Sequence, residues 1–275
     1  METCSVVMAV YQKDTSEWFE QAINSILGQT VKSDDIIVVC DGPIPKALDK
    51  VVKKYERRKE VLVVRLPKNV GAGRARNEGI KRAKNKLIAI MDADDIALPN
   101  RFELEIEQFN LDEGLTLVGG QIAEFENDDT ENIVSYRVMP LSNEDIVRFA
   151  RRRMPVNNPT IMFKKDVVLG CGGYGDVRRC QDYYMVAHLI AAGHKIENIP
   201  ETVLLYRLDD SAIRRSKSWV HMKSSIATQM EVYKLGVGSV ADLVLVSASK
   251  MVLFVLPTFA VKRIYRIFAR KKAVA

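Results

Sequence analysis

Four short runs of apolar residues divide the first hundred positions of the chain. Each run is apolar at successive positions, which is typical of strands buried on both faces of a parallel sheet. The runs lie at residues 6–10, 36–40, 62–66 and 87–91. Between them, apolar residues recur at helical spacing, and we expect helices at 17–27, 47–58 and 73–83. Strands that alternate with helices predict an α/β fold of right-handed βαβ units, with a mostly parallel sheet flanked by helices.

Beyond residue 99 the alternation becomes irregular. We expect a helix at 101–111, strands near 117–125 and 161–163, and a helix at 182–192. No internal repeat or low-complexity linker separates the two halves, so the second half is interpreted as an elaboration of the same sheet.

The composition indicates the class of protein but does not identify its ligand. Hydrophobic residues make up 47% of the 275 positions, which is enough to bury a substantial core. The net charge of +6 permits anionic partners, including nucleotide diphosphates and anionic lipid. The four cysteines form no Cys-x-x-Cys pair, and no basic segment precedes the first apolar run. We therefore expect reduced thiols, no signal peptide and a cytoplasmic protein.

Carboxylates follow two of the four predicted strands. Asp41 comes directly after the second strand, and Asp92 and Asp94 come directly after the fourth. In open parallel sheets, ligands bind beyond the carboxyl ends of the strands. Two carboxylates one residue apart in an extended segment are able to share a divalent cation and a ribose. An isolated Asp-x-Asp pair is also typical of a loop that caps the next helix, but its place after a buried strand favours a binding site.

Four motifs in this order resemble the inverting family 2 glycosyltransferases of GT-A fold that act in bacterial polysaccharide biosynthesis. The motifs are Ser-Val-Val-Met-Ala-Val-Tyr at 5–11, Asp-Gly at 41–42, Asn-Val-Gly-Ala-Gly-Arg-Ala-Arg-Asn-Glu-Gly at 69–79, and Met-Asp-Ala-Asp-Asp at 91–95. The resemblance implies a GT-A type nucleotide-binding sheet and transfer of a hexose from a sugar nucleotide, assisted by Mn²⁺ or Mg²⁺.

The first two motifs imply how the donor base is held. Tyr11 matches the aromatic residue that stacks on the base, with the backbone of Ala9 beside it. Asp41 matches the carboxylate that bonds the pyrimidine ring. A carboxylate accepts from an imide N–H such as that of uracil, so we expect a UDP-sugar, with a dTDP-sugar as a close second.

The other two motifs imply how the diphosphate and metal are held. Arg76 matches the basic residue near the nucleotide, Asp92 the acid beside the ribose, and Asp94 the metal-binding acid. We expect Asp92 to contribute to the metal site as well, because the pair is able to share one cation. Taken alone, a tyrosine such as Tyr11 after a strand is usually a packing residue, and Asp41 before Gly42 is more often part of a plain turn. The segment 69–79, taken alone, is also consistent with a helix entry whose arginines lie in solvent.

Later segments match the acceptor side and the catalytic base of the family. A glycine-rich turn at 172–175 leads to Gln181 and Asp182, where the family usually has an acidic pair; Gln181 replaces the first acid. The resemblance assigns Asp182 as the base that deprotonates the acceptor hydroxyl. Residues 157–160 match the segment that lines the acceptor site. A helix N-terminal acid that stabilises the helix dipole is the alternative for Asp182.

A Tyr-Arg motif ending at Arg207 also resembles the family, whose next residues often include a histidine that closes over the diphosphate. No histidine follows here, so we expect the cation facing the diphosphate to be Arg207 or one of the basic residues farther along the same loop. Those further candidates are Arg214, Arg215 and Lys217.

The last part of the chain is apolar and then basic. Between residues 240 and 261, Asp242, Lys250 and Pro257 interrupt the apolar positions, so no membrane-spanning segment is expected. Beyond Pro257, basic residues fall on one helical face and apolar residues on the other, which is typical of a helix in the interface of an anionic membrane. A helix packed on the domain with its basic face in water is the alternative.

These observations predict a GT-A domain at 1–238 and a membrane-associating helical tail at 239–275. Within the domain, residues 1–100 bind the nucleotide sugar and residues 101–238 the acceptor. We expect a peripheral protein at the inner face of the plasma membrane that acts on a glycan or lipid-linked acceptor. A nucleotidyltransferase is disfavoured, because no glycine-rich basic loop follows the first strand. A basic nucleic-acid-binding protein is also disfavoured, and a protein that only binds sugar nucleotides stays open.

Overall fold

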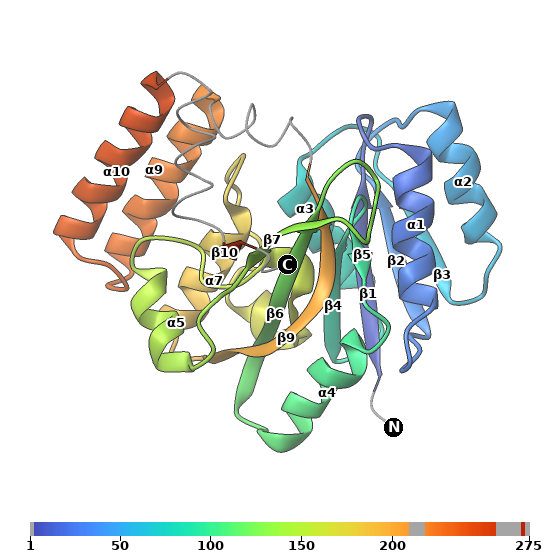
Figure 1. The fold of residues 1–275 in the computed structure, drawn as a ribbon, viewed down its shortest axis with the longest axis horizontal. Helices are drawn as coiled ribbons and strands as arrows, with labels where there is room; N and C mark the ends of the chain where they lie inside the picture. Colours follow the sequence, from blue (N-terminus) through green and yellow to red (C-terminus); the bar gives the residue numbers. More distant parts are fainter. Residues whose placement is uncertain (1–2, 209–217, 257–270, 273–275) are drawn as a thin grey trace.

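The computed structural model describes residues 3–208 and 218–256 and the backbone of residues 271–272. The first half alternates strands and helices as predicted, with bounds within about two residues of those expected. Its elements are β1 (Cys4–Val10), α1 (Ser16–Leu27), β2 (Asp35–Cys40), α2 (Lys46–Glu56), β3 (Val61–Arg65), α3 (Ala72–Arg82) and β4 (Leu87–Asp92). The four strands are parallel and lie in the order β4-β1-β2-β3 (Figure 1).

The second half continues the same sheet. Its elements are β5 (Ile96–Ala97), α4 (Arg101–Leu111), β6 (Leu115–Phe125), β7 (Ile133–Arg137), α5 (Asn143–Ala150), the 3₁₀ helix η1 (Asn158–Thr160), β8 (Met162–Lys164), α6 (Lys165–Gly170), α7 (Gln181–Ala191), β9 (Lys195–Arg207), α9 (Trp219–Lys234), α10 (Val240–Val255) and β10 (Lys271–Lys272). Strand β8 is antiparallel to both β4 and β6 and joins the halves, while β6 and β9 are parallel. The prediction of an α/β fold with a mostly parallel sheet flanked by helices is confirmed.

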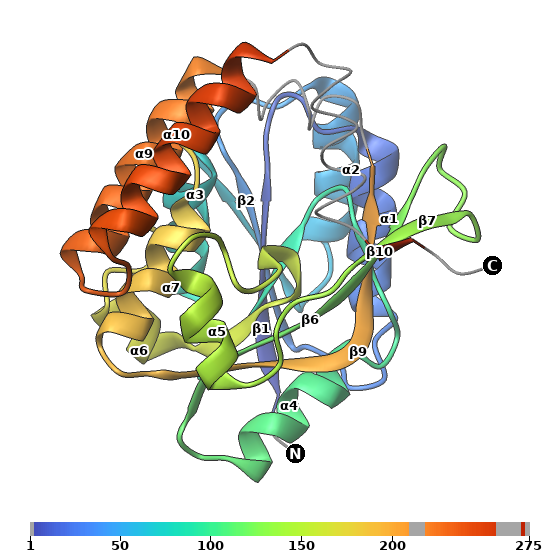
Figure 2. The same cartoon turned by 60° about the vertical axis from the view of Figure 1, so that its left-hand side comes forward.

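Helices cover both faces of the sheet. Val6 and Met8 of β1 pack in one apolar cluster with α1, α2 and α4, whereas Val7 packs in another with α3, α6 and α7. Successive side chains of a strand point to opposite faces, so a strand between two helical layers must be apolar at every position. Figure 2 shows the two layers on either side of the sheet.

The C-terminal helices α9 and α10 form a pair at one edge of the molecule (Figure 1). Helix α9 packs against α7, and α10 packs against α9. None of the helices in the described ranges is both long enough and apolar enough to cross a bilayer. The amphipathic helix predicted beyond Pro257 lies largely outside the described residues.

Candidate active site

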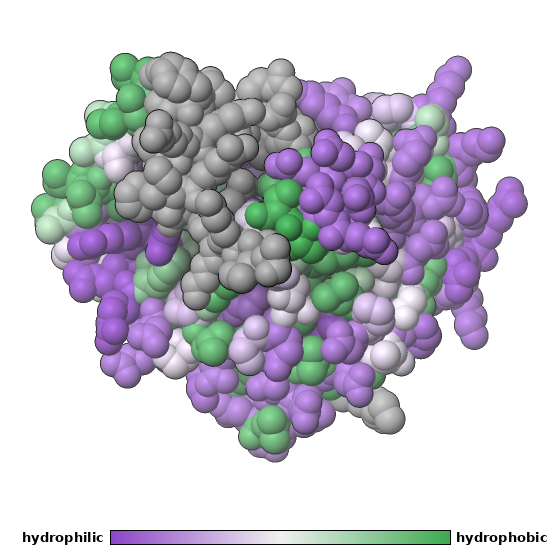
Figure 3. All heavy atoms as spheres, in the orientation of Figure 1, coloured by the Kyte–Doolittle hydropathy of each residue, from purple (hydrophilic) through white to green (hydrophobic). Residues whose placement is uncertain are grey.

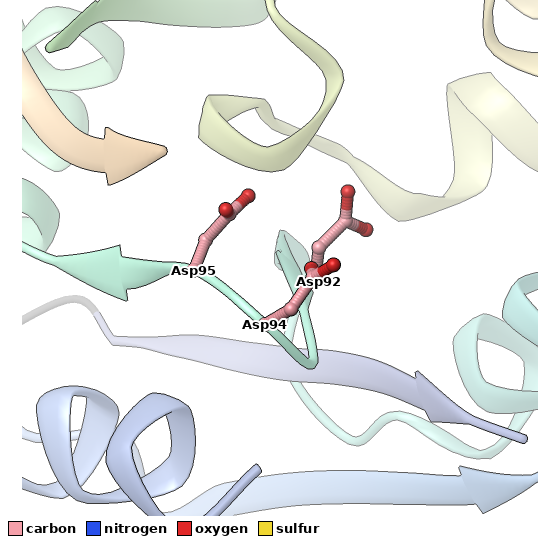
Figure 4. A group of neighbouring side chains, drawn as sticks. All are labelled: Asp92, Asp94 and Asp95. Atoms are coloured by element: carbon pink, nitrogen blue, oxygen red, sulfur yellow. The ribbon is translucent and has the colours of Figure 1, made fainter. Parts of the chain in front are cut away.

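Three carboxylates gather at the carboxyl end of β4. Each of Asp92, Asp94 and Asp95 offers an oxygen, and these oxygens all lie within 4.8 Å of one another. Figure 4 shows the side chain of Asp92 at the end of the strand and those of Asp94 and Asp95 on the turn that follows it. Asp92 and Asp94 were predicted from the sequence to bind metal; Asp95 was part of the same motif but had no predicted role.

Asp95 completes the donor set for a cation. Its Oδ1 accepts from the backbone N–H of Arg207 at 3.0 Å, but its Oδ2 is buried and has no hydrogen-bond partner. Burial raises the pKa of Asp95 well above its ordinary value, and the charges of Asp94 and Asp92 raise it further. A buried carboxylate oxygen without a partner is costly, and oxygen ligands are those that Mg²⁺ and Mn²⁺ prefer. The cluster therefore fits a divalent cation.

Arg76 stands beside this cluster. Its Nη2 donates to Asp92 Oδ1 at 2.6 Å, and its guanidinium lies over the ring of Tyr174 at 5.4 Å from the ring centre. Burial alone lowers the pKa of Arg76, but the charge of Asp92 and the neighbouring Tyr174 outweigh it, and the net shift is upward. Arg76 is thus a fixed cation that offsets part of the negative charge.

The predicted catalytic base, Asp182, lies in the first turn of α7. The charges of Arg76 and Asp92 both affect its pKa. Burial raises its pKa, Arg76 lowers it and Asp92 raises it, with a net upward shift. Its Oδ1 accepts from the N–H of Tyr183 at 2.9 Å. The fold therefore brings the candidate base from α7 together with the acidic cluster from β4.

Tyr174 connects four of these segments, and sequence reasoning gave it no role. Its backbone N–H and C=O bond the side chain of Asn77 in α3 at 2.9 and 2.8 Å. Its hydroxyl donates to Asn158 Oδ1 in η1 at 2.8 Å. The turn before it admits only glycine, because Gly173 has φ +61° and a Cβ there would lie 2.6 Å from Asn77 Oδ1. Tyr174 thus links the turn before Asp182 to α3, to η1 and, through Arg76, to β4.

The residues predicted to bind the pyrimidine base of the donor lie at the ends of adjacent strands. Ala9 is the β1 partner of Asp92 in the sheet, and Tyr11 follows β1. Asp41 is buried at the end of β2, where it accepts from the N–H groups of Val70 at 2.6 Å and Gly71 at 3.0 Å. It therefore fixes the loop before α3, and its contact with a pyrimidine stays a prediction.

Arg207 is buried at the end of β9. Its Nε donates to the carbonyl of Asp94 at 2.9 Å, and its Nη2 donates to Gln21 Oε1 at 2.5 Å. Its guanidinium also pairs with Asp128 and lies 4.9 Å from the Trp18 ring centre and 4.7 Å from that of Phe125. Arg207 thus holds the turn of Asp94 against α1; contact with a diphosphate stays a prediction. Arg214, Arg215 and Lys217 lie outside the described residues.

A pocket of about 260 Å³ opens beside Gln181, the residue before Asp182. Residues 70–74, at the start of α3, form one wall, and residues 175–181 form the other. Gln181, which replaces the first acid of the family motif, lines it. The pocket is thus bounded by two of the segments that the sequence assigned to the donor and to the catalytic base.

Comparison with known proteins gives one family. The model of "Glycosyl transferase family 2" matches residues 5–171, more than half of the chain; the match includes Asp41, Arg76 and the β4 acids but ends before Asp182. An uncharacterized glycosyltransferase of Haemophilus influenzae is 32% identical over 97% of this chain and 99% of its own length.

Two further relatives carry more specific names. The amylovoran biosynthesis glycosyltransferase AmsE of Erwinia amylovora is 32% identical over 84% of each chain. The UDP-Gal:alpha-D-GlcNAc-diphosphoundecaprenol beta-1,3-galactosyltransferase of Escherichia coli is 27% identical over 97% of this chain and 96% of its own.

Among solved structures, TarS 1–349 of Staphylococcus aureus in complex with UDP-GlcNAc has a TM-score of 0.64, at 16% identity, covering 92% of this chain and 70% of that one. This likeness confirms the GT-A type fold. The family match and the two 32% identical relatives identify the chain as a member of glycosyl transferase family 2.

Proposed function

We propose that the protein is a metal-dependent inverting hexosyltransferase of cell-surface polysaccharide biosynthesis. It moves a hexose from a UDP-sugar to a hydroxyl of a glycan or lipid-linked acceptor. One observation carries the proposal: Asp182 lies within electrostatic reach of Arg76 and Asp92, beside an acidic cluster suited to a cation. The names of the relatives support the pathway class, since one is named for amylovoran biosynthesis and another for a diphosphoundecaprenol acceptor.

Asp182 acts as the general base in this proposal. Its carboxylate takes the proton of the acceptor hydroxyl while the hydroxyl oxygen attacks the anomeric carbon. The bond from that carbon to the diphosphate breaks on the opposite face, its electron pair leaves with UDP, and the anomeric configuration inverts. The raised pKa of Asp182 makes the carboxylate a stronger base than one in water.

Arg76 and the acidic cluster act on the leaving group. Asp92, Asp94 and Asp95 would hold Mn²⁺ or Mg²⁺, which neutralises charge on the diphosphate when bound. Arg76 is held by Asp92 and adds a fixed positive charge on the same side. We also propose that Ala9, Tyr11 and Asp41 bind the pyrimidine base of the donor. Arg207 is proposed as a further residue of the nucleotide-sugar site.

UDP is the favoured nucleotide for three reasons. Asp41 suits a pyrimidine edge, and the Escherichia coli relative is named for a UDP-Gal donor. TarS, which shares the fold, has been solved with UDP-GlcNAc. We also propose that residues 1–238 form the transferase domain and that residues 239–275 associate with the inner leaflet of the plasma membrane.

A donor panel tests the proposal. Purified protein is incubated with UDP-, dTDP- and GDP-sugars, with Mn²⁺ or with a chelator, and free nucleoside diphosphate is measured with and without acceptor. We expect release from UDP-sugars that requires the metal and is lost in Asp94→Ala and Asp182→Asn. Asp166→Asn, which changes an exposed acid in the first turn of α6, is the matched control and keeps activity.

Three results would contradict the proposal. Release of inorganic pyrophosphate from a nucleoside triphosphate would indicate a nucleotidyltransferase. Tight nucleotide binding without turnover, even with polyprenyl-diphosphate acceptors, would indicate a binding protein. Equal activity in the chelator would exclude the role of the metal.

A further inference from the structure

Helix α10 carries an apolar face that remains exposed. Only Asp242 and Val246 of this helix are buried. Six of its apolar side chains are more than half exposed: Val240, Val244, Leu245, Met251, Val252 and Val255. At 3.6 residues per turn these positions fall within one side of the helix, which we call the docking face. Figure 3 shows hydrophobic surface over α10 at the edge of the molecule.

The orientation of this face is fixed by an ion cluster at the start of the helix. The carboxylate of Asp242 accepts from Arg151 Nη2 at 2.8 Å and from Arg152 Nε at 2.6 Å. It also accepts from Ser239, and these bonds hold its pKa well below the ordinary value. A surface helix normally turns its apolar side inward and its charge outward. In α10 the acidic residue Asp242 points to the domain, whereas the six apolar residues of the docking face point away from it.

Basic and aromatic residues flank the docking face at both ends. Beside the start of α10, the side chains of Arg151 and Arg152 remain about half exposed despite their bonds to Asp242. Near the other end, Trp219 is 53% exposed, its ring lies 5.8 Å from that of Phe254, and Lys223 Nζ lies 5.1 Å from the Trp219 ring. Exposed tryptophan and basic residues around an apolar strip are typical of helices that lie in a membrane interface.

We propose that the docking face binds an anionic lipid surface, with the axis of α10 in the plane of the membrane. The sequence after α10 adds Lys262, Arg263, Arg266 and Arg270 to the same end of the chain. A second copy of this chain is disfavoured as the occupant, because each copy carries a charge of +6 and like charges repel, whereas anionic lipid attracts both.

The docking face is joined to the candidate base through packed helices. Tyr183, the neighbour of Asp182, packs with Val232 of α9, and its hydroxyl lies 3.4 Å from Gln229 Oε1. Helix α10 in turn packs on α9. Docking would therefore hold the active site at a fixed place relative to the bilayer, where the diphosphate of a lipid-linked acceptor lies. That purpose rests on the proposed function, but vesicle binding is measured without donor or acceptor.

The test uses the full chain and sedimentation with lipid vesicles. Vesicles of phosphatidylcholine alone are compared with vesicles that also contain phosphatidylglycerol. We expect the protein to partition at least about tenfold more strongly to the anionic vesicles. The double variant Val244→Glu/Val252→Glu should lose about tenfold or more of that binding, because two charges enter the apolar strip. Leu111→Glu is the matched control: Leu111 is 75% exposed on α4 and its change should leave binding unaltered.

Thermal unfolding and UDP binding show whether the variants fold. Vesicle binding of the double variant equal to that of the unchanged chain would overturn the proposal. So would equal binding to neutral and anionic vesicles. Loss of a dimer in light scattering, with vesicle binding intact, would assign the face to a second copy instead. Vesicle binding by a chain that lacks transferase activity would leave this inference standing while the proposed function fails.

Discussion

Removal of one hydroxyl group tests whether Tyr174 links the donor and acceptor sides of the site. In Tyr174→Phe the aromatic ring stays under Arg76, and the two backbone bonds to Asn77 stay as well. Only the bond from the hydroxyl to Asn158 Oδ1, at 2.8 Å, is lost. Asn158 lies in the segment that resemblance assigns to the acceptor side, so the variant loosens that side alone.

The cost follows from the burial of Tyr174, which is only 2% exposed. The acceptor, Asn158 Oδ1, is only partly buried, so loss of this bond costs about 0.5–1.5 kcal/mol, as for a typical hydrogen bond. For a chain of this size, 1 kcal/mol lowers the melting temperature by roughly 2–4 °C. If about 1.4 kcal/mol of this cost falls on acceptor positioning, kcat/KM for the acceptor falls about tenfold, because that free energy corresponds to one decade in rate.

Tyr55→Phe provides a matched control. The Tyr55 hydroxyl donates to Asn24 Oδ1 at 2.7 Å, and Tyr55 is also buried, but it joins α2 to α1 away from the acidic cluster. Both variants should lose similar thermal stability. Only Tyr174→Phe should raise the acceptor KM, while UDP binding measured by calorimetry stays within about twofold of the original chain, equivalent to about 0.4 kcal/mol. Equal transfer kinetics in the two variants, at equal loss of stability, would refute the linking role.

Three further substitutions test the catalytic role of Asp182, metal binding by Asp95 and the raised pKa of the buried Glu105. Asp182→Asn should lower the rate of transfer by about 10²–10⁴-fold with UDP binding retained. In the unchanged enzyme, the raised pKa of Asp182 should shift the acidic limb of the pH profile of kcat to a higher pH than an ordinary aspartate would give. Asp95→Asn should weaken Mn²⁺ binding in calorimetry with UDP, while Asp166→Asn should not. Glu105, buried and bonded to Arg101, has its pKa raised to about 7 by burial. The stability that this carboxyl contributes is present below its unfolded pKa and lost as pH rises through about 7. The free energy of unfolding should therefore fall between about pH 4.5 and 7, measured by urea titration, and fall less in Glu105→Gln.

The first half of the fold was predictable because its strands are buried on both faces. Every residue of β2 is buried, and the five that follow Asp35 form a continuous apolar run in the sequence. Strand β9 was not predicted, because it contains Pro200 and Glu201 and has an irregular burial pattern. Helix α9 was missed because polar residues such as Thr228 and Gln229 are buried in it, and no amphipathic pattern marks it.

The acidic cluster could be predicted from the sequence because Asp92, Asp94 and Asp95 are neighbours on one turn. Its contacts with Asp182 and Tyr174 could not be derived from spacing, since those residues come from segments far along the chain. Only the family resemblance placed Asp182 in the site. Asn77 lay within the predicted motif, but its two bonds to the backbone of Tyr174 depend on how the turn at Gly173 packs against α3.

The family resemblance assigns ligand-binding roles to Asp41, Arg76 and Arg207, and the structure shows which of their atoms already bond other protein groups. Both oxygens of Asp41 accept from the loop before α3, and the guanidinium of Arg207 bonds Asp94, Gln21 and Asp128. These residues therefore hold the loops around the proposed nucleotide site, whatever direct contact they make with a ligand. Arg76 differs, because its bond to Asp92 is made to another predicted site residue. Removal of Asp41 or Arg207 should thus disturb loop geometry and donor affinity together, whereas loss of Arg76 acts on the charge of the site itself.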